Sequence, residues 1–233
     1  MQPQTRPVLR EVRPGRETLA AGLAMPRHRH ADAYALVVVA GTLEQVSYAG
    51  RVRLQSGDML VQPTLDCHSN VTRGVSVLRL AWPAVDSLGG VYHLSELDSI
   101  VRAAERDADE ASALAQAAVH RQSLCGGSAT DWPDQLARDL AAGRVRRLRD
   151  WAEANGLEPE TVSRGFARAY GVGPARFAHE LKMRTAWLAI ARTRQSLAAI
   201  AAEAGFADQS HMTRSVKALT GASPRAWRQR GCG

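Results

Sequence analysis

Three histidines in the N-terminal half of the chain have the residue type and spacing of metal ligands. His28 and His30 are separated by one residue, and His68 lies further along the chain. Residues i and i+2 of a β-strand lie on the same face, so we expect the first two imidazoles to point in one direction. Neutral imidazoles bind zinc, iron, nickel or copper, and three protein ligands leave one coordination position open. Without a metal, the same side chains would line a pocket for an organic ligand or form ordinary hydrogen bonds.

Three polar residues are candidates for the surroundings of these histidines. Cys67 immediately precedes His68, so in a regular strand its thiol points to the opposite face, whereas a β-bulge would make it a fourth ligand. Tyr34 and Gln62 are candidates for the wall of a ligand pocket. The only cofactor we expect is one divalent transition metal, which would be zinc, iron, nickel or copper.

The segment that carries these residues has the pattern of β-structure. Residues 35–39 are a short apolar, β-branched run that ends before Gly41, and residues 75–82 alternate between apolar and polar side chains. Gly50 and Gly57 mark turns. Several short strands separated by glycine turns predict a sandwich or a barrel.

Two stretches of this segment resemble the two motifs of the cupin superfamily. They are Gly22-x5-His28-x-His30-x3-Tyr34-x6-Gly41 and Gly57-x5-Pro63-x4-His68. In metal-binding cupins, the three histidine positions and a glutamate hold a metal inside a small barrel. Here Tyr34 stands at the glutamate position, and Leu65 replaces the usual glycine of the second motif. The resemblance therefore implies a cupin-like barrel with an internal site of altered ligand set.

The charge of the chain is concentrated in its C-terminal part. The 233 residues carry a formal net charge of +7, yet residues 1–133 have a net charge of −1 and residues 134–233 a net charge of +8. Such asymmetry predicts a neutral module joined to one that binds a polyanion. No apolar run approaches the roughly 20 residues of a membrane span, and the polar N-terminus lacks the apolar core of a secretory signal. Three scattered cysteines fit a reducing compartment, so we expect a cytoplasmic protein without membrane contact.

The C-terminal part contains two copies of one helical unit. Residues 148–157 align with residues 197–206 at an offset of 49, and the match then continues at an offset of 50. The later equivalent pairs are Arg164 and Arg214, Phe166 and Val216, Gly171 and Gly221, Pro174 and Pro224, and Phe177 and Trp227. Each copy reads as helix, tight turn and helix, and residues 174–192 between them read as one long helix. In the second copy, Gly205 is the expected end of the first helix, Asp208 the expected N-cap of the next, and Gly221 its expected end.

A helix–turn–helix unit places its second helix in the DNA major groove, where its N-terminal residues reach the bases. The exposed faces of the two second helices carry arginine, glutamine, serine and threonine, which are suited to bases or phosphates. The candidate DNA contacts are Glu160, Thr161, Ser163, Arg164 and Arg168 in the first copy, and Gln209, Ser210, His211, Thr213, Arg214 and Lys217 in the second. The alternative is that Arg164 and Arg214 are ordinary solvated side chains on a helix surface. Further candidates for phosphate contacts are Arg146, Arg147, Arg149, Arg176 and Arg225.

The second copy resembles the signature of the AraC/XylS family of transcriptional regulators. The matching stretch runs from Gly205 to Arg228 and reads GFADQSHMTRSVKALTGASPRAWR. Met212 and Val216 stand where the family most often has phenylalanine, and both keep the position apolar. The resemblance covers residues 136–233 and implies two helix–turn–helix subdomains joined by a rigid helix, which read adjacent major-groove segments of promoter DNA.

A helical segment is expected between the two parts. Ser95 and Asp98 have the spacing of a capping box. Apolar residues then recur at alternating spacings of four and three over about three heptads, namely Leu97, Val101, Ala104, Ala108, Ala111, Ala115 and Ala118. This seam predicts either a helix packed on its own barrel or a helix that forms a homodimer. Residues 125–133 have the composition of a linker.

Together these patterns predict a multidomain protein. An all-β cupin-like barrel spans residues 1–93, a dimerisation helix and linker span residues 94–133, and an all-α domain of two helix–turn–helix units spans residues 134–233. We expect a regulator, not an enzyme, whose binding to double-stranded promoter DNA responds to a small molecule or a metal in the barrel, with homodimerisation and contact to RNA polymerase as further expectations. The alternative is a three-histidine iron dioxygenase with an accessory DNA-binding domain.

Overall fold

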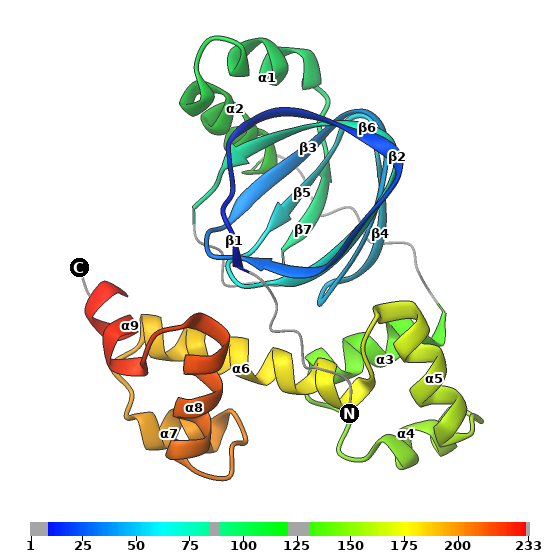
Figure 1. The fold of residues 1–233 in the computed structure, drawn as a ribbon, viewed down its shortest axis with the longest axis vertical. Helices are drawn as coiled ribbons and strands as arrows, with labels where there is room; N and C mark the ends of the chain where they lie inside the picture. Colours follow the sequence, from blue (N-terminus) through cyan, green and yellow to red (C-terminus); the bar gives the residue numbers. More distant parts are fainter. Residues whose placement is uncertain (1–8, 84–88, 121–130, 232–233) are drawn as a thin grey trace. The chain divides into compact units, whose positions relative to one another are not determined.

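The computed structural model describes residues 9–83, 89–120 and 131–231, and these form two units (Figure 1). Unit 1 comprises the described residues up to Asp139 together with Gly165–Gly171, and unit 2 comprises Leu140–Arg164 and the described residues from Val172 onward. Cys125 and most of the expected linker lie outside the described residues. No helix among the described residues is both long and apolar enough to cross a membrane.

Unit 1 is built on one seven-stranded sheet that curves around a common interior (Figure 1). Its strands are β1 (Leu9–Arg10), β2 (Gly15–His30), β3 (Tyr34–Ser47), β4 (Gly50–Gln55), β5 (Asp58–Gln62), β6 (Cys67–Ala81) and β7 (Gly90–His93). They follow the order β1-β2-β6-β3-β5-β7, and β4 pairs with β3. All pairs are antiparallel except β1 with β2. This confirms the expected all-β domain, although no pairing among the described strands joins β7 to β1 to close a barrel.

The two faces of the sheet carry separate apolar clusters because successive side chains of a strand alternate between faces. On β3, Tyr34, Leu36 and Val38 belong to the cluster on the concave face. The intervening Ala35 and Val37 belong to the cluster on the opposite face. The concave face is thus the one that can surround a ligand.

Two helices cover the outer face of the sheet. They are α1 (Leu97–Ala104) and α2 (Ala108–His120). The helix is interrupted between Ala104 and Ala108, where the sequence predicted one continuous helix. The capping-box prediction was wrong, since the N-cap of α1 is Glu96 and makes no side-chain cap hydrogen bond. Ala111, Ala115 and Ala118 of the predicted seam are buried against the outer cluster. Small side chains let α2 approach the sheet closely, so the seam is accounted for within one chain and dimerisation stays a prediction.

Gly41 of β3 is required by its surroundings as well as by its backbone. It has a φ of +82°, and a Cβ atom there would overlap the backbone carbonyl of Gly74 on β6. Gly22 has a similar φ of +78°, but a Cβ atom there meets nothing within 4 Å. We therefore expect Gly22→Ala to lower the free energy of unfolding by about 1–2 kcal/mol through its positive φ, and Gly41→Ala to lower it by clearly more. Urea denaturation followed by circular dichroism measures both, and equal losses would contradict the proposed clash.

The C-terminal part is helical, and its described helices follow the predicted order except for the first, which was not predicted from the sequence. They are α3 (Trp132–Ala141), α4 (Leu148–Ala154), α5 (Pro159–Tyr170), α6 (Pro174–Arg192), α7 (Leu197–Glu203), α8 (Gln209–Thr220) and α9 (Pro224–Gly231). The long central helix has the bounds that the sequence predicted. The expected linker through residue 133 was too long, because α3 begins at Trp132. Pro133 is tolerated in the first turn, where a backbone N–H has no partner within the helix.

Unit 1 includes the first part of α3 and the last residues of α5. The Arg51 guanidinium of β4 donates to the Asp134 carboxylate of α3 at 2.9 Å. The Tyr170 hydroxyl at the end of α5 donates to the same carboxylate at 2.5 Å. These bonds extend unit 1 past the boundary at residue 133 that the sequence suggested.

Candidate functional site

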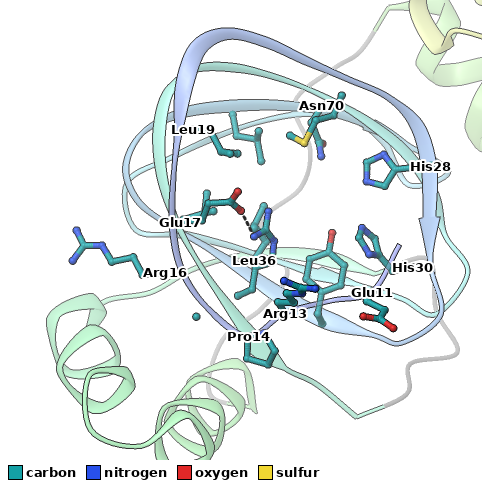
Figure 2. A pocket seen from close by; sticks show the side chains of 16 residues that line it. Glu11, Arg13, Pro14, Arg16, Glu17, Leu19, His28, His30, Leu36 and Asn70 are labelled. Carbon is teal, nitrogen blue, oxygen red and sulfur yellow. Dashed lines mark hydrogen bonds and ion pairs between the residues drawn. The ribbon is translucent and has the colours of Figure 1, made fainter. Parts of the chain in front are cut away.

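The three histidines predicted as ligands come together on the concave face of the sheet. Within the described part of the chain, they are the one group of three or more potential metal ligands, and their ligand atoms all lie within 4.8 Å of one another. His28 on β2 is directly opposite His68 on β6 in the strand register, and His30 follows His28 by two residues. Their exposed fractions are 4%, 8% and 0% for His28, His30 and His68. Figure 2 shows His28 and His30 pointing into the same cavity.

The ring of His28 is oriented by a backbone carbonyl. Its Nδ1 lies 2.8 Å from the carbonyl oxygen of Pro26, and a carbonyl can only accept a hydrogen bond. Nδ1 therefore carries the proton and Nε2 carries the lone pair. Metal-binding histidines commonly have this arrangement, in which the second ring nitrogen donates to a carbonyl or carboxylate.

His68 sits in a buried polar network. Its Nδ1 accepts a hydrogen bond from the side-chain amide nitrogen of Gln62 at 2.9 Å, and its Nε2 lies 3.4 Å from the hydroxyl of Tyr34. Gln62 is itself held by Gln45, at 2.8 Å, and by the carboxylate of Asp66. Metal binding through Nε2 of His68 requires the proton on Nδ1, so the Gln62 amide would have to turn its oxygen toward that atom, which reverses its orientation in this structure.

Burial keeps His68 uncharged. It lowers the pKa of His68 well below the ordinary value, and the neighbouring His28, His30 and Arg27 lower it further. A neutral imidazole is the form that binds metals. Burial also raises the pKa of the Tyr34 hydroxyl, which therefore stays protonated at neutral pH.

Cys67 lies outside the histidine cluster. It is buried, but Cys67 pairs with Arg29 while its neighbour His68 pairs with His28, so the strand is regular at this point. The register shift of β2 falls between Met25 and His28. The bulge that would turn the thiol toward the histidines is therefore missing, and the register does not support Cys67 as a fourth ligand.

The cluster opens into a cavity of about 370 Å³ on the concave face (Figure 2). Tyr34 lines this cavity as predicted, whereas Gln62 lies behind the histidines and acts on His68. Sequence reasoning missed the polar residues Glu11, Arg13, Arg16, Glu17, Asn70 and Arg79, which also line it. Asn70 could have been found, since it follows His68 by two residues on β6 and so shares its face.

The opposite wall of the cavity combines an ion pair with apolar side chains. The Arg79 guanidinium donates to the carboxylate of Glu17, and a dashed line marks this pair in Figure 2. The apolar lining comes from Leu19, Met25, Leu36, Leu43 and Val77. The cavity can therefore surround a small molecule with one polar end and one apolar end.

The second candidate site is formed by the surfaces of α5 and α8. None of the eleven predicted DNA contacts on these helices is buried. On α8, Met212 and Val216 point into the core and are fully buried, while Gln209 and Arg214 are exposed. His211 is half-buried and its ring contacts those of Phe206 and His179. Of the further phosphate candidates, Arg176 is paired with Glu180 at 3.0 Å.

The start of α8 is fixed by a side-chain cap. Asp208 Oδ1 accepts a hydrogen bond from the backbone N–H of His211 at 2.6 Å, and Gly221 ends the helix with a φ of +75°. Both features were predicted from the sequence. We expect Asp208→Ala to lower the unfolding free energy by about 1 kcal/mol. Asp208→Ser should retain most of the parent stability, because serine also caps helices well. Urea denaturation of the two variants checks this, and equal stability of Asp208→Ala and the parent protein would rule out the cap as a stabilising contact.

Two short helices joined by a turn, with a polar face on the second, define a helix–turn–helix module. Residues 151–230 match the family model for a helix-turn-helix domain. The C-terminal part of the chain is an AraC-type helix–turn–helix domain, which confirms the resemblance found in the sequence.

Solved structures with a similar arrangement have low sequence identity to this chain. ToxT from Vibrio cholerae has a TM-score of 0.42 and 9% identity, and the match covers 94% of this chain and 100% of that one. ToxT with a bound unsaturated fatty acid, from the same organism, has a TM-score of 0.41 and 12% identity, with 92% and 93% covered. A probable AraC family transcriptional regulator from Rhodopseudomonas palustris has a TM-score of 0.38 and 22% identity, with 42% and 94% covered. No curated protein matches the sequence.

Proposed function

We propose that this protein is a transcription regulator that binds promoter DNA through α5 and α8 and responds to a ligand in the concave cavity of its sheet. The observation that carries the first part is the helix-turn-helix match over residues 151–230. The net charge of +8 over residues 134–233 adds attraction to the phosphate backbone.

The exposed side chains of the two second helices have complementary roles in this proposal. Arg164 and Arg214 are suited to bidentate hydrogen bonds with guanine, and Gln209 to adenine. Arg168 and Lys217 lie further along their helices and are assigned to phosphates. The remaining serine and threonine side chains serve either bases or phosphates.

Selection of binding sites from random duplex DNA, followed by footprinting, tests DNA recognition. We expect an enriched sequence with two protected major-groove segments about 34–36 Å apart, which is one helical turn. Binding of equal strength to random and selected duplexes would overturn sequence-specific recognition.

The finer part of the proposal is that His28, His30 and His68 hold one divalent transition metal. The residues suit such an ion, because the three rings are buried, His68 is neutral and the Pro26 carbonyl leaves Nε2 of His28 available. A bound metal would supply a Lewis-acidic centre with an open position toward the cavity. The protein's own residues orient the rings, exclude bulk water and shape the space beside them.

Elemental analysis of protein purified without a histidine tag tests metal binding. We expect about one equivalent of zinc, iron, nickel or copper per chain. A chain that remains metal-free after incubation with each of these ions would restrict the cavity to organic ligands and would remove the metal from the proposal.

A further inference from the structure

The ligand set of the histidine cluster contains no anion. This step rests on the metal site proposed above. Three neutral imidazoles cancel none of the charge of a divalent ion, and within the described residues the cluster contains no carboxylate or thiolate. Tyr34 stands where the cupin motif has a glutamate. The buried carboxylate of Asp66 lies 4.0 Å from Nδ1 of His68, but it is outside the ligand set. A buried charge is costly unless it is paired, so the site favours an anionic co-ligand that reaches the ion directly.

Asn70 shows which other group the co-ligand should carry. Its side chain is 7% exposed and lines the cavity, and Figure 2 shows it on the same side of the cavity as His28. Its Oδ1 atom is buried and has no hydrogen-bond partner among the described residues. A buried acceptor left without a donor is costly, because it has lost its hydrogen bonds to water. A ligand hydroxyl in this position would satisfy the atom.

The rest of the wall favours an apolar tail on the ligand. Leu19, Leu36, Leu43 and Val77 line the cavity beside the charged residues Glu11, Arg13 and Arg16, and the ion pair of Arg79 with Glu17 neutralises two further charged side chains. A short branched hydrocarbon would bury apolar surface against these residues. The volume of about 370 Å³ accommodates a molecule of this size.

We propose that the cavity takes a small 2-hydroxy acid with an apolar tail as co-ligand of the metal. The carboxylate supplies the missing negative charge, and the hydroxyl on the adjacent carbon supplies the donor for Oδ1 of Asn70. These two groups also offer neighbouring oxygens to one ion, whereas the tail contacts the leucine and valine side chains. Small 2-hydroxy acids with an apolar tail are therefore the class of effector for the proposed regulator.

Three matched acids separate these contributions. The probes are 2-hydroxy-4-methylpentanoate, 4-methyl-2-oxopentanoate, which lacks the donor, and 4-methylpentanoate, which lacks the second oxygen. Each is titrated into untagged protein loaded with Co²⁺, with calorimetry for affinity and the visible absorption of Co²⁺ for its coordination. We expect the hydroxy acid to bind about tenfold more tightly than the oxo acid, in line with one satisfied buried acceptor, and the plain acid to bind most weakly.

Two variants test the assignment of the groups. In Asn70→Leu, which keeps the side-chain size, the hydroxy acid is expected to lose its tenfold advantage while both chelating acids still change the Co²⁺ spectrum. In Leu19→Trp, a half-buried wall position, the ring fills the cavity, and we expect all three acids to lose affinity while Co²⁺ binding persists. The unchanged Co²⁺ spectrum of each variant alone shows that it is folded.

The outcomes distinguish this inference from the proposal on which it rests. If the protein takes up no Co²⁺, both the metal site and the hydroxy-acid site are wrong. If it takes up one equivalent but the three acids bind equally without a spectral change, the metal site stands and the hydroxy-acid site is overturned. An Asn70→Leu protein that keeps the full preference for the hydroxy acid would remove Asn70 from the assignment and overturn the choice of a hydroxyl.

Discussion

Replacing His68 with alanine is expected to abolish stoichiometric metal binding. His68 is fully buried and contacts the other two histidines and Tyr34, so its loss leaves two of the three ligands. Apparent metal-binding free energies of structural zinc sites are about 10–16 kcal/mol. Loss of one of three ligands should therefore weaken binding by several kcal/mol, which is a factor of about 10³ or more. Competition with a chromophoric chelator measures the change.

His93→Ala is the matched control for this variant. His93 belongs to β7 of the same sheet, but it is exposed and contacts Asp58 at 3.0 Å, away from the cluster. We expect it to bind metal like the parent protein. Equal losses in His93→Ala and His68→Ala, or full binding by both, would contradict the three-histidine site.

The second large effect is expected on DNA, from the double variant Arg164→Ala and Arg214→Ala. The two arginines are equivalent positions of the repeated unit, on α5 and α8, and both are exposed. Each single change should cost about 1–3 kcal/mol and relax selection at one base pair. Because the two residues belong to separate helix–turn–helix units, the costs should add, giving a loss of roughly 30-fold to 10⁴-fold in affinity. Mobility-shift titration on the selected duplex provides the affinities.

Arg106→Ala is the control for the loss of one positive charge outside the DNA-binding helices. This exposed arginine precedes α2 and pairs with Glu110 at 3.4 Å, within unit 1. It should leave the preference for the selected duplex unchanged. If Arg214→Ala weakens binding equally on all sequences, the residue contacts phosphate, and if the double variant binds normally, the two helices are not the reading elements.

Local signals made much of the helical part predictable. The bounds of α6, the Asp208 cap and the Gly221 end depend on residues within a few positions of each other, so the sequence contained them in full.

The seam from Leu97 to Ala118 was ambiguous for a physical reason. The same spacing of small apolar residues serves a helix that packs on its own sheet and a helix that pairs with another chain, and only the buried contacts of Ala111 and Ala115 reveal the former.

The candidate site in the sheet was predicted only where motif spacing determined it. The meeting of His28 with His68 followed from the resemblance to the cupin motifs. The polar groups of the cavity wall depend on the pairing of β2 with β6, which brings Glu17 near Arg79 across a large sequence distance. No local pattern encodes that register, so Arg79 was missed. The inward position of Asn70 follows from its spacing to His68, but its role in lining the cavity is seen only in the structure.

The account's central claim is that occupancy of the histidine cluster alters DNA binding, and one comparison tests it directly. The affinity of the untagged full chain for its selected duplex is measured after metal removal by a chelator and again after reloading with Zn²⁺. A coupling free energy of about 1–3 kcal/mol predicts a change of about 5–150-fold, and His68→Ala should show no such change. Equal affinities of the metal-free and reloaded protein would contradict the claim.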